Sequence, residues 1–370
     1  MKTKQLMISK LCRRNLLPTK NPVNRPLVPA ALRISTSTLL ILIISFFASC
    51  DNPIFEELEK ALHEKKSKCE SVPGPAQLLA TVEGASGSTI GPDGALYVAE
   101  PVAGKISRID PKTGDVTTFA YGLPLQLPGV GVGGVFDVAF LGEVAYALVT
   151  LVGPDVGGSD TVGIYRIDGP NSFTVIADIG AFSIADPPNT PFDVPTGVQY
   201  SIQPYHGAFL VADGHHNRVL HVTRNGEITE IKAFGNIVPT GLALSGHTIY
   251  LAQAGPVPHL PENGKIVSFD QKSPKVTTVA SGARLLVDVE FNGRTLFALS
   301  QGFWDGVVEG TPAEPNTGSL VKVNHDGTFT QVVDRLDRPT SLEFIHNTAY
   351  IVTLTGEIWT IGDVTCLPYL

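Results

Sequence analysis

The sequence lacks the short motifs that mark many enzymes. It contains no GxSxG, no P-loop, no CxxC and no HExxH, which argues against the hydrolases, nucleotide-binding proteins, redox proteins and zinc peptidases that carry them. One segment, GVGVGG at residues 129–134, fits the pattern GxGxxG. It precedes an expected strand instead of linking a strand to a helix, so we interpret it as a loop between strands and not as a dinucleotide site.

Basic residues are scarce beyond the N-terminus. All 35 acidic residues lie after position 50, whereas eight basic residues fall within the first 33 positions. From Cys50 onward the chain has 19 basic and 35 acidic residues, a formal charge of −16. Because phosphate binding needs clustered Lys and Arg, this balance excludes nucleic acid as the main partner.

A hydrophobic run of membrane-spanning length is also missing. The apolar run from Leu39 to Phe47 is shorter than the ~20 residues that a transmembrane helix needs. After a basic start and before small residues, it predicts a signal peptide over residues 1–49. The segment FASC, which ends at Cys50, resembles the lipobox of bacterial lipoproteins and makes Cys50 the candidate for lipidation. Plain signal cleavage and an uncleaved anchor are the alternatives.

These features predict an extracytoplasmic protein of the bacterial cell envelope, either an outer-membrane lipoprotein or a periplasmic protein. It would contact the membrane only through an N-terminal lipid anchor. Residues 50–75 are expected to form the anchor and a spacer, because apolar residues between Ile54 and Leu62 recur at helical spacing and predict a short helix.

The remaining chain, residues 76–366, shows a strand pattern that recurs six times. One strand of each unit is an apolar run such as ALYVAE, AYALVT, AFLVAD, TIYLAQ, TLFALS or AYIVTL. A strand precedes each run, another follows it, and a fourth is recognisable in five units. Six units of four antiparallel strands predict an all-β fold, a six-bladed β-propeller. Only the sixth unit lacks a fourth strand, and we expect the strand at 76–83 to complete that blade and close the ring.

Four cysteines are present, and two of them bear on this closure. Cys12 would leave with the signal peptide and Cys50 is the lipidation candidate, which leaves Cys69 and Cys366. These two flank the closing strand and its expected partner, so the sequence predicts a disulfide between them. Two unpaired thiols are the alternative.

The candidate site comes from aligning the units at the start of their first strands, which line the channel of a propeller. All six aligned residues bear side-chain oxygens: Ser88, Asp137, Thr196, Thr240, Asp288 and Thr340. Asp137 and Asp288 stand half a ring apart and are candidate ligands of a hard cation such as Ca²⁺ or Mg²⁺. In the alternative interpretation these residues cap the turns that enter the strands and bind channel water.

Further candidates lie where the second strands end on the same face, among them Glu100 and Asp213. The loops that follow in the second, fourth and fifth units are long and rich in Pro and Gly, and Trp304 in one of them could bind a sugar or another polar ring. Packing against a neighbouring blade is the alternative for Trp304. In the segment LVADGHHNRVLHV, we expect Asp213 to accept hydrogen bonds from the turn backbone, and His215 and His216 to be rim residues open to a ligand.

The segment LVADGHHNRVLHV resembles the NHL-repeat signature, and GPDGALYVAE resembles both NHL proteins and the SMP-30/gluconolactonase propellers. Together with DVAF, YRIDG and VPTGV they make residues 80–362 most similar to the ScyD/ScyE-type family. The resemblance implies an extracytoplasmic six-bladed propeller. The SMP-30 lactonases use a Glu, Asn and Asp metal triad, but here Ser88 and Thr89 occupy the region of the first Glu.

Two functions follow. The sequence favours a monomeric, lipid-anchored binding protein for a small polar ligand, a cation or a protein partner. The alternative is a metal-dependent hydrolase of the SMP-30/gluconolactonase type, with Asp137 and Asp288 holding the ion.

Overall fold

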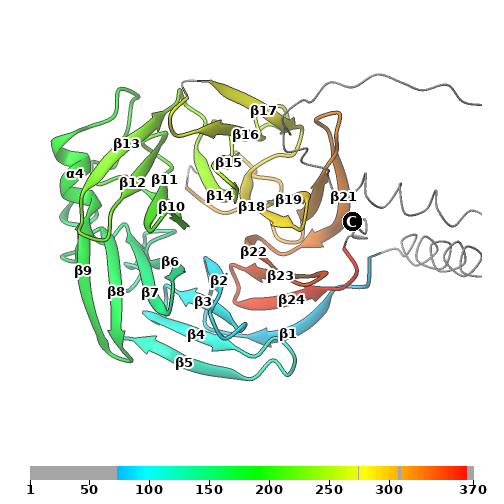
Figure 1. Ribbon diagram of the computed structural model, residues 1–370, viewed down its shortest axis with the longest axis horizontal. Coiled ribbons are helices and arrows are strands. Elements are labelled where there is room, and N and C mark those ends of the chain that lie inside the picture. The colour runs from blue at the N-terminus through cyan, green and yellow to red at the C-terminus, as the bar shows by residue number, and fades with distance from the viewer. Residues whose placement is uncertain (1–72, 274, 307–309, 365–370) are drawn as a thin grey trace, which may run out of the picture. The chain divides into compact units, whose positions relative to one another are not determined.

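The computed structural model describes residues 73–364 except 274 and 307–309. Its strands form six four-stranded antiparallel sheets arranged as blades around a central channel (Figure 1). The predicted all-β, six-bladed propeller is therefore confirmed. The predicted signal peptide, Cys50, the spacer helix and the Cys69–Cys366 disulfide lie outside the described residues.

The first three blades follow one another along the chain. Blade 1 consists of β2 (Ser88–Ile90), β3 (Leu96–Glu100), β4 (Lys105–Ile109) and β5 (Val116–Tyr121). Blade 2 consists of β6 (Gly134–Leu141), β7 (Val144–Thr150), β8 (Gly163–Gly169) and β9 (Ser172–Asp178). Blade 3 consists of β10 (Gln199–Tyr205), β11 (Ala208–Asp213), β12 (Arg218–Val222) and β13 (Ile228–Ala233).

The other three blades repeat this order. Blade 4 consists of β14 (Pro239–Ser245), β15 (Thr248–Gln253), β16 (Lys265–Asp270) and β17 (Val276–Ser281). Blade 5 consists of β18 (Leu286–Asn292), β19 (Thr295–Ser300), β20 (Gly318–Val323) and β21 (Phe329–Leu336). Blade 6 consists of β22 (Pro339–Ile345), β23 (Thr348–Thr353), β24 (Glu357–Ile361) and β1 (Gln77–Thr81).

The ring closes as the sequence predicts, because β1 from the N-terminal side pairs with β24 of the last blade. A backbone hydrogen bond from Gly74 N to Gly362 O, 3.0 Å long, extends the pairing beyond the strands. The closing strand therefore leaves no unpaired edge on β24.

The core lies between neighbouring blades. The second strand of blade 3, AFLVAD, is buried along its whole length, whereas half of the residues in the fourth strands of blades 3 and 4 are exposed. Between blades 1 and 2, Tyr97 packs edge-on against Phe140 and Phe119, with ring centroids 4.7 and 5.0 Å apart. Such apolar contacts hold each blade to the next and fix the channel geometry.

Two short helices interrupt the strand pattern. One is the 3₁₀ helix η1 (Pro154–Val156), and the other is α4 (Ile179–Ala185), whose N-terminal N–H of Ala181 donates to Asp178. The sequence pattern does not predict α4, because seven residues hold too few turns to show a helical period. None of the helices in the described residues is long and apolar enough to span a membrane.

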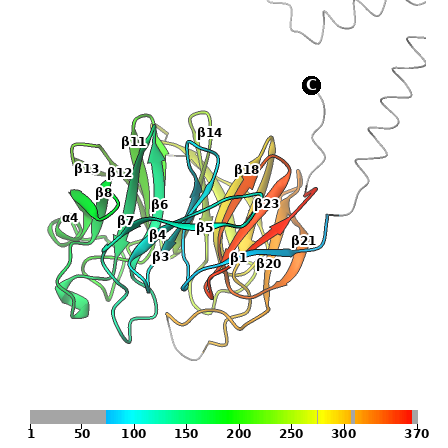
Figure 2. The ribbon, with the colours of Figure 1, turned by 90° about the horizontal axis from the view of Figure 1, so that it is seen from below.

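The inner strands, β2, β6, β10, β14, β18 and β22, run along the channel between the two faces of the ring (Figure 2). We call the face where these strands begin the mouth face. At the opposite face each inner strand turns back into the second strand of its blade, and we call it the hairpin face.

Candidate functional site

A β-bulge near the start of the inner strand shapes the channel mouth. In blades 2, 3, 5 and 6 the pairing register skips one residue of the inner strand: Phe136, Tyr200, Val287 and Thr340. In blade 4 it shifts between Pro239 and Leu242, around Thr240. Because a bulge re-aims the extra side chain, these residues and Ser86 of blade 1 line the cavity at the channel mouth. We call these six residues the mouth ring.

The residue after each mouth-ring position forms a second ring that holds the blades together. We call it the latch ring, and it consists of Gly87, Asp137, Ser201, Gly241, Asp288 and Ser341. Asp137 Oδ2 accepts a hydrogen bond of 2.9 Å from Ile202 N in the next blade, and Asp288 Oδ2 accepts one of 2.8 Å from Leu342 N. Ser341 Oγ accepts from Ser88 N at 3.1 Å, which joins blade 6 to blade 1.

The latch ring repeats after three blades, in the order Gly, Asp, Ser, Gly, Asp, Ser. The glycines are required by the aspartates, because a Cβ at Gly241 would lie 2.5 Å from Asp288 Oδ1, and a Cβ at Gly87 would overlap the Asp137 carboxylate. The propeller is thus built from two similar halves of three blades. The two halves share the latch ring, which includes the hydrogen bonds between neighbouring blades.

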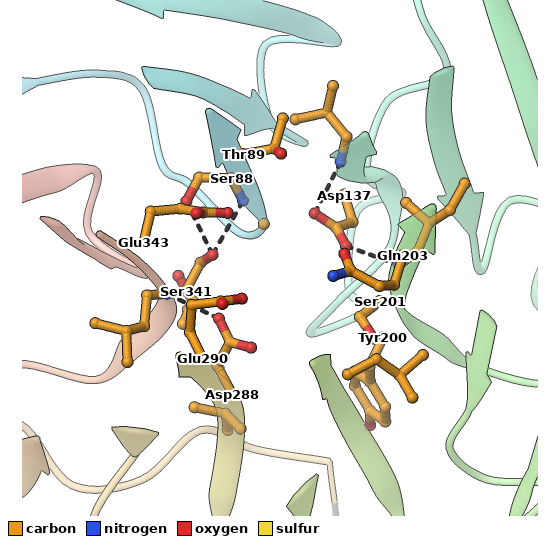
Figure 3. A pocket seen from close by; sticks show the side chains of 17 residues that line it. Ser88, Thr89, Asp137, Tyr200, Ser201, Gln203, Asp288, Glu290, Ser341 and Glu343 are labelled. Atoms are coloured by element: carbon orange, nitrogen blue, oxygen red, sulfur yellow. Dashed lines mark hydrogen bonds between the residues drawn. The ribbon is translucent and has the colours of Figure 1, made fainter. Parts of the chain in front are cut away.

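Two residues further along each inner strand the halves differ. This third ring, the channel ring, consists of Thr89, Ala139 and Gln203 in one half and Ala243, Glu290 and Glu343 in the other. Glu290 and Glu343 lie on one side of the channel, and Gln203 and Asp137 lie on the other (Figure 3). The channel cavity that they line has a volume of about 40 Å³.

Burial strongly disfavours the charged forms of the channel carboxyls. It raises the pKa of Asp288 to about 7 and that of Glu290 to about 8. Burial, together with the neighbouring carboxyls of Glu290, Asp288 and Asp137, raises the pKa of Glu343 well above its usual value. Burial also raises the pKa of Asp137 well above its usual value, although the N–H groups of Ile202 and Val138 act against it. The protonated forms of these carboxyls are therefore more favoured in the channel than they are in water.

We expect this burial to make the domain less stable at high pH. The folded state keeps the Glu290 proton until the pH reaches about 8, whereas the unfolded chain releases it near the ordinary glutamate pKa of 4.5. The free energy of unfolding therefore falls as the pH rises between these values. Glu290→Gln, which imitates the protonated form, should match the wild type at about pH 4 and exceed it in stability above pH 8 in urea unfolding. A difference between the two proteins that does not change with pH would contradict this assignment.

The six aligned oxygen-bearing residues of the sequence analysis do not share one structural position. Asp137 and Asp288 lie in the latch ring, Thr240 and Thr340 in the mouth ring, and Ser88 one residue beyond the latch. Thr196 precedes β10 and donates to Asp155 Oδ2 at 2.8 Å. The predicted alignment of these residues is therefore wrong. Each bulge adds one residue to an inner strand, so residues that align in the sequence do not occupy equivalent positions in the blades.

The hydroxyls of the mouth ring bond to neighbouring backbone. Thr240 Oγ1 donates to Leu286 O at 2.9 Å, and Thr340 Oγ1 donates to Ser86 O at 2.8 Å. Ser86 Oγ donates to Phe136 O. These oxygens therefore hold blades together instead of forming a ligand set.

The aspartates do not fit a Ca²⁺ or Mg²⁺ site either. Both oxygens of Asp137 and of Asp288 accept backbone N–H groups, which leaves few lone pairs for an ion. Within residues 73–364, gaps aside, no cluster of three or more His, Cys, Asp or Glu side chains has the arrangement of a metal site. Asp137 and Asp288 instead connect neighbouring blades through these hydrogen bonds. This role is similar to the alternative interpretation, in which such residues cap the starts of the strands.

The histidine segment is also corrected. His216 is only 1% exposed, and its Nδ1 lies 3.0 Å from Asp213 Oδ2. Asp213 accepts from the side chains of Gln199 and Arg218, at 3.0 and 2.8 Å, and not from the turn backbone. His216 is thus part of a buried polar network and not a rim residue. His215 does line the mouth cavity, with Nε2 3.3 Å from Tyr200 Oη.

Two other candidates have structural partners. Glu100 is buried, accepts from Glu83 N at 2.9 Å and pairs with Lys105 Nζ at 3.2 Å. Trp304 is buried and packs edge-on against His259, with centroids 5.6 Å apart. Its Nε1 donates to Thr311 Oγ1 at 2.9 Å. The structure thus supports the packing alternative for Trp304.

The mouth cavity has a volume of about 160 Å³. Phe136 and Tyr200 meet edge-on in its wall, with centroids 5.9 Å apart, and Val238, Leu285 and Val287 line it as well. Tyr200, Val287 and Thr340 also line the channel cavity, so the two cavities share a wall. Sequence reasoning missed Phe136, Tyr200, Glu290 and Glu343. The two glutamates follow a latch residue by two positions, a signal that appears only when the register is known.

No protein-family model and no curated protein matches the chain. Solved structures do resemble it. A gluconolactonase from Xanthomonas campestris is 12% identical with a TM-score of 0.55, covering 78% of this chain and 89% of its own. A PQQ-bound aldose sugar dehydrogenase from Streptomyces coelicolor is 13% identical with a TM-score of 0.54, covering 79% and 99%.

A putative glucose dehydrogenase from Thermus thermophilus is 15% identical with a TM-score of 0.53, covering 78% of this chain and 99% of its own. At such identities the likeness shows the fold and not a shared activity. The expected likeness to gluconolactonase-type propellers is confirmed at that level, and membership of the ScyD/ScyE-type family stays a prediction. The chain has the fold of the six-bladed propellers.

Proposed function

We propose that this protein is an extracytoplasmic, lipid-anchored binding protein whose ligand is a small organic cation, an apolar ring that carries an ammonium group. The ring would occupy the mouth cavity and the ammonium group would enter the channel. The observation that carries the proposal is the difference between the two halves, which places Glu290 and Glu343 on one side of the channel.

The mouth cavity favours an apolar ring over a sugar. A cavity of about 150 Å³ holds a benzene ring, and the mouth cavity is of that size. Its wall is formed largely by aromatic and aliphatic side chains, with Phe136 and Tyr200 as the largest. The hydroxyls of Ser86, Thr240 and Thr340 are engaged with backbone carbonyls and offer little to a polar ligand.

The channel favours a cation. The latch ring connects the blades in both halves, but only one half has acids in the channel ring. The other half has Ala139 and Gln203 at the positions of Glu290 and Glu343, so these two acids are not needed to connect the blades. Among the described residues no hydrogen-bond donor reaches the Glu343 carboxyl, and Glu290 accepts from Phe291 N at 2.7 Å. Glu290 and Glu343 are half-buried, and the nearby carboxyls disfavour the charged form of Glu343, so an ammonium group between the two would stabilise both.

The net charge of the chain also favours a cationic ligand. Beyond Cys50 the formal charge of −16 attracts cations toward the domain and repels anions. The basic N-terminus and the lipobox-like segment support the anchor and the cell-envelope location. A protein partner and a metal-dependent hydrolase have no comparable observation in their favour.

Three ligands of similar shape test the proposal by isothermal titration calorimetry on the full chain. We expect the affinity for 2-phenylethylamine to be at least about tenfold higher than the affinity for neutral 2-phenylethanol. 3-Phenylpropionate should bind most weakly of the three. Amine binding requires ionised glutamates, so its affinity should rise from pH 6 to pH 8. Equal affinity for amine and alcohol, or preference for the carboxylate, would refute the proposal.

A further inference from the structure

The hairpin face carries a pair of histidines that the ligand site does not use. In blades 2 to 6 a two-residue turn links the inner strand to the second strand, because the residues on either side of the turn are paired. The first turn residue has positive φ in every case. The five first turn residues are Gly142, His206, Gly246, Gly293 and His346.

The turns of blades 3 and 4 bring His206 and His247 together. His247 Nδ1 lies 3.0 Å from His206 Nε2. The two rings are nearly parallel, at 29°, with centroids 4.8 Å apart. Both side chains are exposed. The His206 ring also packs edge-on against the ring of the buried Tyr205, with centroids 4.3 Å apart. This contact helps to hold the His206 ring in place.

We propose that His206 and His247 bind one late first-row divalent ion, Cu²⁺ or Ni²⁺, with solvent completing the coordination. The facing nitrogens, His206 Nε2 and His247 Nδ1, would bind the ion through their lone pairs, in the neutral tautomers that carry the ring proton on His206 Nδ1 and His247 Nε2. Imidazole nitrogens are preferred ligands of these ions, and Cu²⁺ stands highest in the affinity order of divalent metals.

The spacing of the nitrogens selects the geometry. With metal–nitrogen bonds of about 2.0–2.1 Å, two nitrogens 3.0 Å apart subtend about 95° at the ion. Neighbouring ligands in square-planar or tetragonal complexes, which Cu²⁺ and Ni²⁺ prefer, stand at about 90°. Tetrahedral Zn²⁺ would need the nitrogens further apart. The site therefore ranks Cu²⁺ and Ni²⁺ above Zn²⁺.

Rigid turns make the pair suitable for chelation. Each imidazole projects from a short turn anchored by strand pairing on both sides. Ordering the ligands before the ion arrives lowers the entropic cost of binding. The proposal is independent of the ligand site, because the turns lie at the face opposite the mouth.

The chain supplies a matched control. His346 occupies the first turn position of blade 6 with φ of 55°, close to the 50° of His206, and it is exposed as well. Blade 6 corresponds to blade 3 in the three-blade repeat. Among the described residues no ring contact joins His346 to a second histidine. His346→Asn thus makes the same chemical change at the corresponding place without touching the pair.

The test is a calorimetric titration of the untagged full chain with Ni²⁺. We expect one saturable site in the wild type, and an affinity lowered about tenfold or more in His206→Asn and in His247→Asn. His346→Asn should bind as the wild type does. Asn tolerates positive φ, so the turn at position 206 should survive the change.

Spectroscopy of the Cu²⁺ form gives a second readout. Two nitrogen ligands should appear in the electron paramagnetic resonance spectrum of the wild type and be lost in the double variant. The proposal is overturned if no Ni²⁺ binds, if the pair variants bind as tightly as the wild type, or if His346→Asn weakens binding to the same extent.

Discussion

Gly241→Ala should lower the free energy of unfolding by about 3 kcal/mol, the upper end of the usual cost of overpacking. The added Cβ would lie 2.6 Å from the Asp288 Cα and 2.5 Å from its Oδ1. Neither atom can move freely, because Asp288 holds Leu342 N in the next blade at 2.8 Å. The substitution therefore disturbs two blade junctions at once, and urea unfolding with circular dichroism measures the loss.

Gly235→Ala is the matched control. A Cβ at Gly235 has no atom within 4 Å, and this glycine does not have a positive φ. The change should be neutral, or slightly stabilising through the lower entropy of the unfolded chain. If both variants unfold at the same urea concentration, the latch ring does not hold the blades in the way described.

The strands and the closure could be predicted from the sequence, but the site could not. Each second strand is a short apolar run bounded by turn residues, and AFLVAD is visible without any structure. β1 was predictable because the sixth unit lacked a strand and an unassigned one preceded the first unit. Both signals depend on local composition, which tertiary context did not override.

The site depends on register, which local composition does not show. A bulge at Tyr200 or Val287 inserts one residue, so a ring of oxygens chosen by alignment mixes mouth and latch positions with residues that belong to neither ring. Glu290 and Glu343 then look like ordinary alternating residues of half-buried strands. The buried state of His216 was equally hidden, because its partner Asp213 was expected to bond to the turn backbone.

Glu290→Gln with Glu343→Gln should lower the affinity for 2-phenylethylamine about tenfold or more, which corresponds to ~1.4 kcal/mol. The change keeps the shape of both side chains and removes the charge that the ammonium group would meet. Affinity for 2-phenylethanol should stay the same, because the ring contacts at Phe136 and Tyr200 are unaffected. Calorimetry of both ligands at pH 8 measures the two effects separately.

A control removes the same charge elsewhere. Glu143 and Glu227 are exposed, and their double change to Gln alters the net charge without touching the channel. Long-range attraction between exposed groups is largely screened at physiological salt, so this variant should bind the amine as the wild type does. An equal loss in both double variants would mean that overall charge, and not the channel pair, sets the affinity.

The crystal structure of the complex with 2-phenylethylamine tests the central claim most directly. We predict the phenyl ring in the mouth cavity against Phe136 and Tyr200, with its nitrogen within hydrogen-bond distance of Glu290 and Glu343. A ligand bound elsewhere, or bound in the mouth with its nitrogen turned away from the channel, would contradict the claim.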